Sequence, residues 1–155
     1  MTTDGTVSRI VVGIDGSEGS LEALRWAARE AELHGAELLV LMAWRLPVVG
    51  PYLPAFPLDA GAWEEGARQE LQGALAAAFG DKLPDGVRAE LRPGLPASVL
   101  VEAGKHADLV VVGSRGHGGF VGALLGSVST AVIHHATGPV LVVRPRLEHG
   151  TKASH

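Results

Sequence analysis

Glycine and serine residues crowd the stretch 113–129, and this composition suits an anion-binding loop. The stretch follows an apolar run at 109–112 and precedes an amphipathic one at 128–135, so we expect a strand to end at Gly113 and a helix to begin near Ser127. Glycine lets a ligand approach the main chain closely, and a helix N-terminus adds unpaired N–H donors and partial positive charge. The sequence therefore predicts a loop that cradles nucleotide phosphates, although glycine content alone equally allows a flexible surface connection or a packing surface.

The loop matches neither of two common phosphate-binding motifs. Gly113 and Gly118 have the spacing that opens a Walker A motif, but Gly119 and Phe120 stand where lysine and serine or threonine are required. A dinucleotide fingerprint that began at Gly116 would lack its third glycine. With no lysine in the loop, we expect a site that binds a nucleotide more readily than it cleaves one.

Phosphate charge must then be met by other groups. The candidates are backbone amides, the hydroxyls of Ser127 and Ser129, the side chain of Arg115 and a divalent cation. A solvated surface position is an equal alternative for Arg115 and His117, and Ser129 could instead face solvent one turn into the helix. Ser127 could equally cap that helix, a role that is compatible with phosphate binding.

Length and composition limit the classes of protein to which the chain can belong. A chain of 155 residues that is 46% hydrophobic fits a single domain, which we place at 1–146 with a disordered tail at 147–155. The net charge of −4 argues against a nucleic-acid surface, and the absence of cysteine excludes thiol chemistry. No apolar run approaches the ~18 residues that would span a bilayer, and the first five residues do not resemble a signal peptide. We expect a soluble cytoplasmic protein with no membrane partner.

Apolar and amphipathic runs alternate along the chain. We expect strands at 9–15, 37–44, 87–92, 107–113 and 139–144, and helices at 17–34, 60–79, 96–106 and 127–135. Four prolines make 45–59 a loop. The alternation predicts an α/β fold, a doubly wound five-stranded parallel sheet with helices on both faces.

The third expected strand alternates charged and apolar residues, so it belongs at an edge, whereas the first, second and fourth read as buried on both faces. The strand order 3-2-1-4-5 satisfies this requirement. It places the topological switch point between the first and fourth strands, where open α/β sheets bind ligands. Asp15 and Gly113 should face that crevice. Asp15 could accept from a ribose hydroxyl, help hold a cation, or cap the first helix with Glu18.

Three other groups of side chains are predicted to be structural. Asp108, at the start of a buried strand, is expected to be a hydrogen-bond acceptor rather than a base. Trp26, Trp44 and Trp63 are expected to pack, with Trp44 near the ligand crevice. No set of His, Asp and Glu residues has metal-ligand spacing, so we expect no structural zinc.

The crevice residues resemble the ATP-binding branch of the universal stress protein family. That branch carries Gly-x2-Gly-x9-Gly-Ser/Thr, and Gly113, Gly116, Gly126 and Ser127 match every position. The resemblance covers 8–145 and extends to further positions, namely Asp15, Gly94-x-Pro96 and the run Pro139-Val-Leu-Val-Val.

The resemblance implies ATP with Mg²⁺ as ligands. It places the phosphates on Ser127, Val128 and the loop 113–119, and Asp15 with Gly13 beside the ribose or adenine. It places adenine at Ala43, where the alignment could slip by one residue. The phosphate loop then comprises Gly113, Ser114, Arg115, Gly116, His117, Gly118 and Gly119, completed by Gly126 and Ser129.

The resemblance also implies a homodimer through the last strand and a regulatory role in stress. An apolar edge strand at Val140–Val143 agrees with such pairing. Hydrolysis should be slow at most, since no general base or arginine finger is evident. The alternatives are a nucleotidyl-transfer enzyme on a related fold, a cyclic-nucleotide-binding module and a nucleotide-free interaction protein.

Overall fold

A computed structural model describes residues 6–46, 51, 59–116 and 125–145 of the chain. Strands and helices alternate there in the predicted order and close to the predicted bounds. The predicted tail and most of the proline-rich loop lie outside these residues. The elements are β1 Arg9–Ile14, α1 Glu18–His34, β2 Glu37–Trp44, α2 Ala60–Phe79, β3 Val87–Pro93, α3 Pro96–Gly104, β4 Leu109–Gly113, α4 Ser127–His135 and β5 Val140–Val143.

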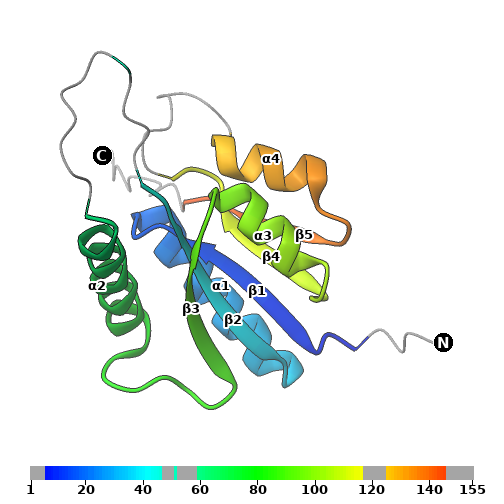
Figure 1. Cartoon of the computed structure of the whole chain (residues 1–155). Coiled ribbons are helices and arrows are strands. Elements are labelled where there is room, and N and C mark those ends of the chain that lie inside the picture. Colours follow the sequence, from blue (N-terminus) through cyan, green and yellow to red (C-terminus); the bar gives the residue numbers. More distant parts are fainter. Residues whose placement is uncertain (1–5, 47–50, 52–58, 117–124, 146–155) are drawn as a thin grey trace, which may run out of the picture.

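The strands form one parallel sheet in the order β3-β2-β1-β4-β5, which confirms the predicted topology. Helices cover both faces, with α1 and α2 on one side and α3 and α4 on the other (Figure 1). β1 lies at the centre, where Val12 pairs with Val40 of β2 and with Val111 of β4. The carboxyl ends of β1 and β4 are therefore adjacent, so the loops that follow them meet at the switch point.

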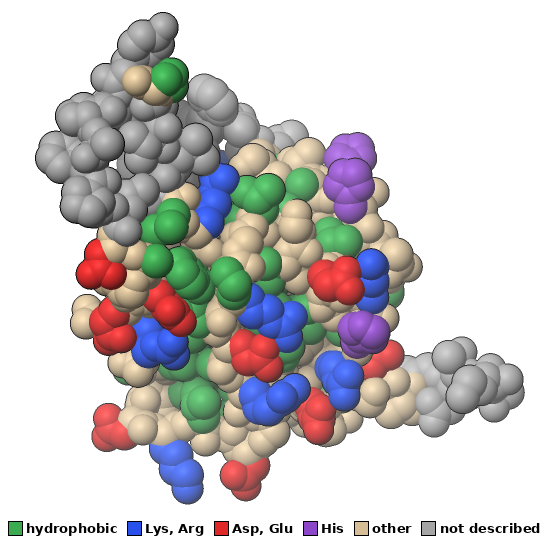
Figure 2. All heavy atoms as spheres, in the orientation of Figure 1, with side chains coloured by type: hydrophobic (Ala, Val, Ile, Leu, Met, Phe, Trp, Pro, Cys, Tyr) green, Lys and Arg blue, Asp and Glu red, His purple; other side chains and the backbone are tan. Residues whose placement is uncertain are grey.

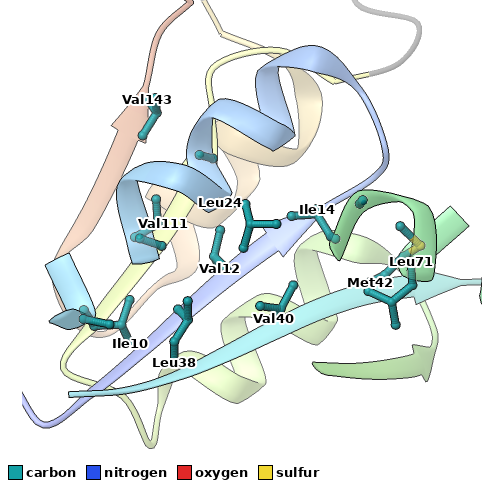
Figure 3. Packing of buried hydrophobic residues seen from close by; sticks show 14 residues of the cluster. Ile10, Val12, Ile14, Leu24, Leu38, Val40, Met42, Leu71, Val111 and Val143 are labelled. Carbon is teal, nitrogen blue, oxygen red and sulfur yellow. The ribbon is translucent and has the colours of Figure 1, made fainter. Parts of the chain in front are cut away.

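The core explains why the central strands are continuous apolar runs. Ile10, Val11 and Val12 are all fully buried, because one face of β1 packs under α1 and the other under α3. Figure 3 shows Val12 beside Leu24 of α1 on the first of these faces. Each such side chain contributes about 1.5–3 kcal/mol when it leaves water. This two-sided core holds the carboxyl edge of the sheet in place.

Local signals set the ends of the first helix. The side chain of Ser17 accepts a hydrogen bond from the N–H of Ser20, so Ser17 is the N-cap as its residue type predicts. Gly35 ends α1 with a φ of 62° and donates its N–H to the last turn, a conformation that glycine adopts without strain.

The two edges of the sheet differ in character. On β3, Arg92 and Arg88 lie 2.8 and 3.8 Å from the carboxylate of Glu90, so this edge strand carries charged side chains on one face. On β5 the side chains are all apolar.

Figure 2 shows basic and acidic side chains interspersed on the face that α3 and α4 cover. No described helix is both long enough and apolar enough to cross a membrane.

Two predictions about individual side chains have different outcomes. Asp108 is a structural acceptor, as expected, because its Oδ2 accepts hydrogen bonds of 2.9 Å from both Ser8 N and Ser8 Oγ and from Arg9 N. The prediction that all three tryptophans pack is wrong for Trp63, which is 48% exposed on the first turn of α2. Trp26 is also partly exposed, and the guanidinium of Arg29 lies over its ring.

Candidate functional site

The turn between β1 and α1 holds Asp15 in a fixed orientation. Asp15 Oδ1 accepts hydrogen bonds from both the N–H and the hydroxyl of Ser17. The Asp15 N–H in turn donates to Ser20 Oγ at 3.3 Å. Since Ser17 caps α1, Asp15 is not the N-cap, and the alternative in which it forms a capping box with Glu18 is wrong. The half-buried carboxylate is positioned by the turn at the end of β1.

The other carboxylate oxygen of Asp15 lies against the connection that follows β4. A Cβ added at Gly116 would overlap Asp15 Oδ2, so any larger residue at this position would have to displace the carboxylate. The φ of Gly116 is not positive, and the backbone conformation therefore does not demand glycine there. The β1–α1 turn and the predicted phosphate loop are in direct contact, as the switch-point topology requires.

Two other glycines bring the loop close to the first turn of α1. A Cβ at Gly113 would lie 3.0 Å from the carbonyl oxygen of Gly19, and one at Gly19 would lie 2.8 Å from the carbonyl oxygen of Arg115. The distance at Gly19 is shorter than real Cβ atoms show, and the one at Gly113 is shorter than most of them show. The small residues therefore allow the N-terminus of α1 to sit against the start of the loop.

Ser114 is hydrogen-bonded both to β5 and to the far end of the loop. Its N–H donates to the carbonyl of Val143 at the end of β5 over 2.9 Å, and its carbonyl accepts from the N–H of Gly126 over 2.5 Å. Gly126 is the N-cap of α4 and offers no side chain to the first turn. The alternative in which Ser127 caps α4 is wrong, because Ser127 is already the first helical residue.

Ser129 does not face solvent, which was the alternative to phosphate contact that the sequence left open. It is 2% exposed, and its hydroxyl lies 3.1 Å from the carbonyl oxygens of both Ser114 and Gly126. The hydroxyl of Ser114 is also buried, and it has no hydrogen-bond partner in the part of the chain that the structure describes. Sequence periodicity on a short helix could not distinguish a buried serine from an exposed one here.

A cavity of about 370 Å³ opens where these segments meet, and we refer to it as the switch-point cavity. It is lined by every predicted site residue in the described ranges except Ser114, which is 1% exposed and lies behind the wall. His117, Gly118 and Gly119 lie outside the described residues. The predicted residues that line the cavity are Gly13, Asp15, Ala43, Gly113, Arg115, Gly116, Gly126, Ser127, Val128 and Ser129.

The cavity also has an apolar end that the sequence did not reveal. Leu41 comes from β2 and Val99 and Leu100 from α3, all of which read as ordinary core residues. A Cβ at Gly13 would overlap the side chain of Leu100, so Gly13 admits this leucine to the cavity floor. That packing role was not foreseen for Gly13. Further lining residues that we did not predict are Ile14, Ser20, Pro96, Val112 and Leu125.

The two ends of the cavity differ in charge and polarity. Asp15 and Arg115 are the charged side chains in the described wall, and both lie with the glycine loop rather than with Leu41 and Leu100. A wider hollow of about 1080 Å³ lies near Gly35 and Gly86, at the amino edge of the sheet. We assign the functional site to the switch-point cavity because the first turns of α1, α3 and α4 all contribute residues to its wall. In the described residues, no group of three or more His, Cys, Asp or Glu side chains could hold a metal ion.

Comparison with known proteins agrees with this fold. The family model described as the universal stress protein family matches residues 6–144. A universal stress protein of Mycolicibacterium smegmatis is 42% identical over 151 residues, which are 92% of this chain and 50% of that protein. One from Mycobacterium tuberculosis strain H37Rv is 43% identical over 136 residues, 87% of this chain and 45% of its own length. The chain thus spans about half the length of these curated relatives.

Solved structures show the same fold. A universal stress protein in complex with cAMP is 30% identical, with a TM-score of 0.65 over 90% of this chain and 98% of that one. The Archaeoglobus fulgidus protein in complex with dAMP has a TM-score of 0.64 at 24% identity, covering 89% of this chain and 98% of its own. From the family match over residues 6–144 and the shared sheet order, we conclude that this chain belongs to the universal stress protein family.

Proposed function

We propose that the chain binds an adenine nucleotide, ATP together with Mg²⁺, in the switch-point cavity, and that occupancy regulates what the domain presents to partners during stress. The observation that carries this proposal is a cavity with one apolar end and one end at a helix N-terminus that has no side-chain cap. Such a cavity matches a ligand that is a flat ring at one end and an anion at the other. Its volume of about 370 Å³ lies within the range of ordinary ligand sites.

The phosphate end is built from main-chain donors. α4 begins at Ser127 without a side-chain cap, so the first-turn amides of Ser127 and Val128 need acceptors. These amides and the helix dipole favour an anion in the cavity that both residues line. The exposed guanidinium of Arg115 supplies a positive charge on the same side. This support does not depend on a lysine, which the loop lacks.

The base end is apolar. Leu41, Ala43, Val99 and Leu100 offer aliphatic surface on which an adenine ring can pack, and Leu100 is almost fully buried. Because β2 and α3 contribute no charged side chain to this wall, the base would be recognised by its shape and by hydrogen bonds to main-chain groups. Adenine fits that environment because most of its surface is a planar π-face.

Asp15 is the reason to include a divalent cation. Its carboxylate lies against Gly116 in the loop, where its negative charge would repel a phosphate. A Mg²⁺ ion between carboxylate and phosphate oxygens removes that repulsion, and Mg²⁺ is commonly held by one or two carboxylates plus substrate phosphates. The ion would neutralise phosphate charge, while Ser17 keeps Asp15 oriented.

A cyclic nucleotide is the second candidate. The relative whose structure contains cAMP is 30% identical to this chain over nearly the same length. A site lined by backbone amides discriminates weakly by number of phosphates, and cAMP needs no cation to offset its single charge. Slow ATP hydrolysis or nucleotidyl transfer remains the enzymatic alternative.

Isothermal titration with ATP, with and without Mg²⁺, and with cAMP tests these proposals on the purified chain. We expect ATP binding that strengthens with Mg²⁺; tighter binding of cAMP than of Mg²⁺-ATP would favour the second candidate. No retention of any nucleotide at millimolar concentration would leave only an interaction protein. Turnover at about 1 s⁻¹ or faster would instead indicate an enzyme.

A further inference from the structure

The hydroxyl of Ser129 cannot serve a phosphate in the way that its position beside the cavity suggests. Ser129 lines the switch-point cavity, but its hydroxyl is directed at two carbonyl oxygens, each 3.1 Å away. A serine hydroxyl has one proton to donate, and here that proton is shared between the carbonyls of Ser114 and Gly126. Phosphate oxygens are acceptors, so Ser129 has no second proton to offer them.

The two carbonyls belong to opposite ends of the phosphate loop. Ser114 follows the last residue of β4, and Gly126 precedes the first residue of α4. The N–H of Gly126 also donates to the Ser114 carbonyl, so that carbonyl accepts from both Gly126 and Ser129. The hydroxyl lies 2% exposed between the two segments, where water competes little for its hydrogen bonds.

We propose that Ser129 is a positioning residue for phosphate binding. Its hydroxyl hydrogen-bonds the start of α4 to the residue that follows β4, so that the amides of both segments point toward one anion. The inference rests on the proposed nucleotide site and assigns Ser129 a role that is not phosphate contact. Without the hydroxyl, the bond from the Gly126 N–H would be the remaining described hydrogen bond between the start of α4 and Ser114, and the packing of α4 on α3 and β5 would have to hold the rest of its position. Part of the preorganisation of the anion site would then be lost.

The apolar end of the cavity provides a reference against which the effect on phosphate binding can be compared. Leu41 and Ala43 lie on β2 and Leu100 on α3, and none of these elements carries the Ser129 bonds. Adenosine, which has no phosphate, should therefore bind independently of the hydroxyl. A general loosening of the fold would instead weaken adenosine and ATP together.

The test is Ser129→Ala, titrated separately with Mg²⁺-ATP and with adenosine. We expect ATP binding to weaken about fivefold, the effect of losing one ordinary hydrogen bond, and adenosine binding to change less than about twofold. The matched control is Thr130→Ala, because Thr130 is the next residue of the same turn and is exposed. It should leave both affinities unchanged.

Each other result overturns the inference. Equal loss for ATP and adenosine would show a general structural role, and no loss for either would show that the Gly126 bond and the packing of α4 suffice. If Ser129→Ala does not fold, Ser129→Cys keeps the side-chain size with a weaker donor and undergoes the same comparison; failure of both to fold would make the hydroxyl a requirement of the whole domain. Failure of the unmodified chain to bind Mg²⁺-ATP would overturn the proposed function itself, a result distinct from all of these.

Discussion

Glycines at the site make room for side chains from other segments that approach them closely, and they do not have an unusual backbone conformation. Gly116 is an example, since its φ is not positive, yet a Cβ would overlap the Asp15 carboxylate. Gly13 likewise makes room for Leu100. The glycine spacing singled out residues that line the switch-point cavity, but the packing reason for each glycine could not be foreseen. That reason depends on which side chain from another segment arrives opposite, and a single sequence does not show such contacts.

Replacing Gly116 with alanine tests this close approach. The new methyl group must displace Asp15, whose Oδ1 is held by both the N–H and the hydroxyl of Ser17. We expect a loss of about 1–3 kcal/mol in the free energy of unfolding, as for other overpacked positions, together with weaker ATP binding. Urea denaturation and titration calorimetry measure the two effects.

The matched control is Gly66→Ala on α2, where a Cβ would meet nothing within 4 Å. That change should leave ATP binding intact and stabilise the fold by up to about 1 kcal/mol through helix propensity. If Gly116→Ala behaved like the control, the contact between Asp15 and the loop would not constrain either the fold or the ligand.

At the scale of elements, the order of the sheet followed from the pattern of burial along each strand. Apart from Arg9 and Glu37 at their starts, β1, β2 and β4 consist of apolar residues and glycine and lie inside the sheet. β3 alternates charged and apolar residues and lies at its edge. Helix ends with a clear signal, such as Ser17 and Gly35, were equally readable. The buried position of Ser129 was not, because α4 has only nine residues and its burial depends on how it docks.

Asp108 joins the start of β4 to the residues just before and in β1, and this link should depend on pH. Hydrogen bonds from Ser8, first from its N–H and then from its hydroxyl, together with the bond from Arg9, lower the pKa of the Asp108 carboxyl. A carboxyl whose pKa is lower in the folded state stabilises the fold above its unfolded pKa of about 3.9. That contribution is lost as the pH falls through the lowered value.

We therefore expect Asp108→Asn to reduce the urea midpoint at pH 7, and the difference from the unmodified chain to shrink below about pH 4. Urea titrations at a series of pH values between 7 and 3 measure this dependence. Ser8→Ala removes one of the donors to Asp108. It should therefore remove only a fraction of the pH-dependent stability that Asp108 contributes. A difference between Asp108→Asn and the unmodified chain that stayed constant with pH would mean that the carboxylate charge does not contribute.

At the scale of the whole molecule, the two open edges of the sheet suggest how copies associate. β3 presents Arg88, Glu90 and Arg92, which discourage pairing with another strand, whereas β5 is short and entirely apolar. In the described sheet β5 is hydrogen-bonded only to β4. We propose that two copies pair through β5, as the resemblance to the family implied. The bond from Ser114 to Val143 would then connect the phosphate loop to that interface.

A proline at Val142 tests this pairing. The carbonyls of Pro139 and Val143 accept from β4, so by strand alternation Val140 and Val142 direct their main-chain groups toward the open edge. Val142→Pro removes an edge donor and keeps the bonds to β4. Light scattering should give twice the 16.0 kDa of one chain for the unmodified protein and one chain mass for the variant, with Arg88→Ala on the opposite edge as the control that stays a dimer. A monomeric unmodified protein, or a variant that folds and stays dimeric, would show that β5 is not the interface.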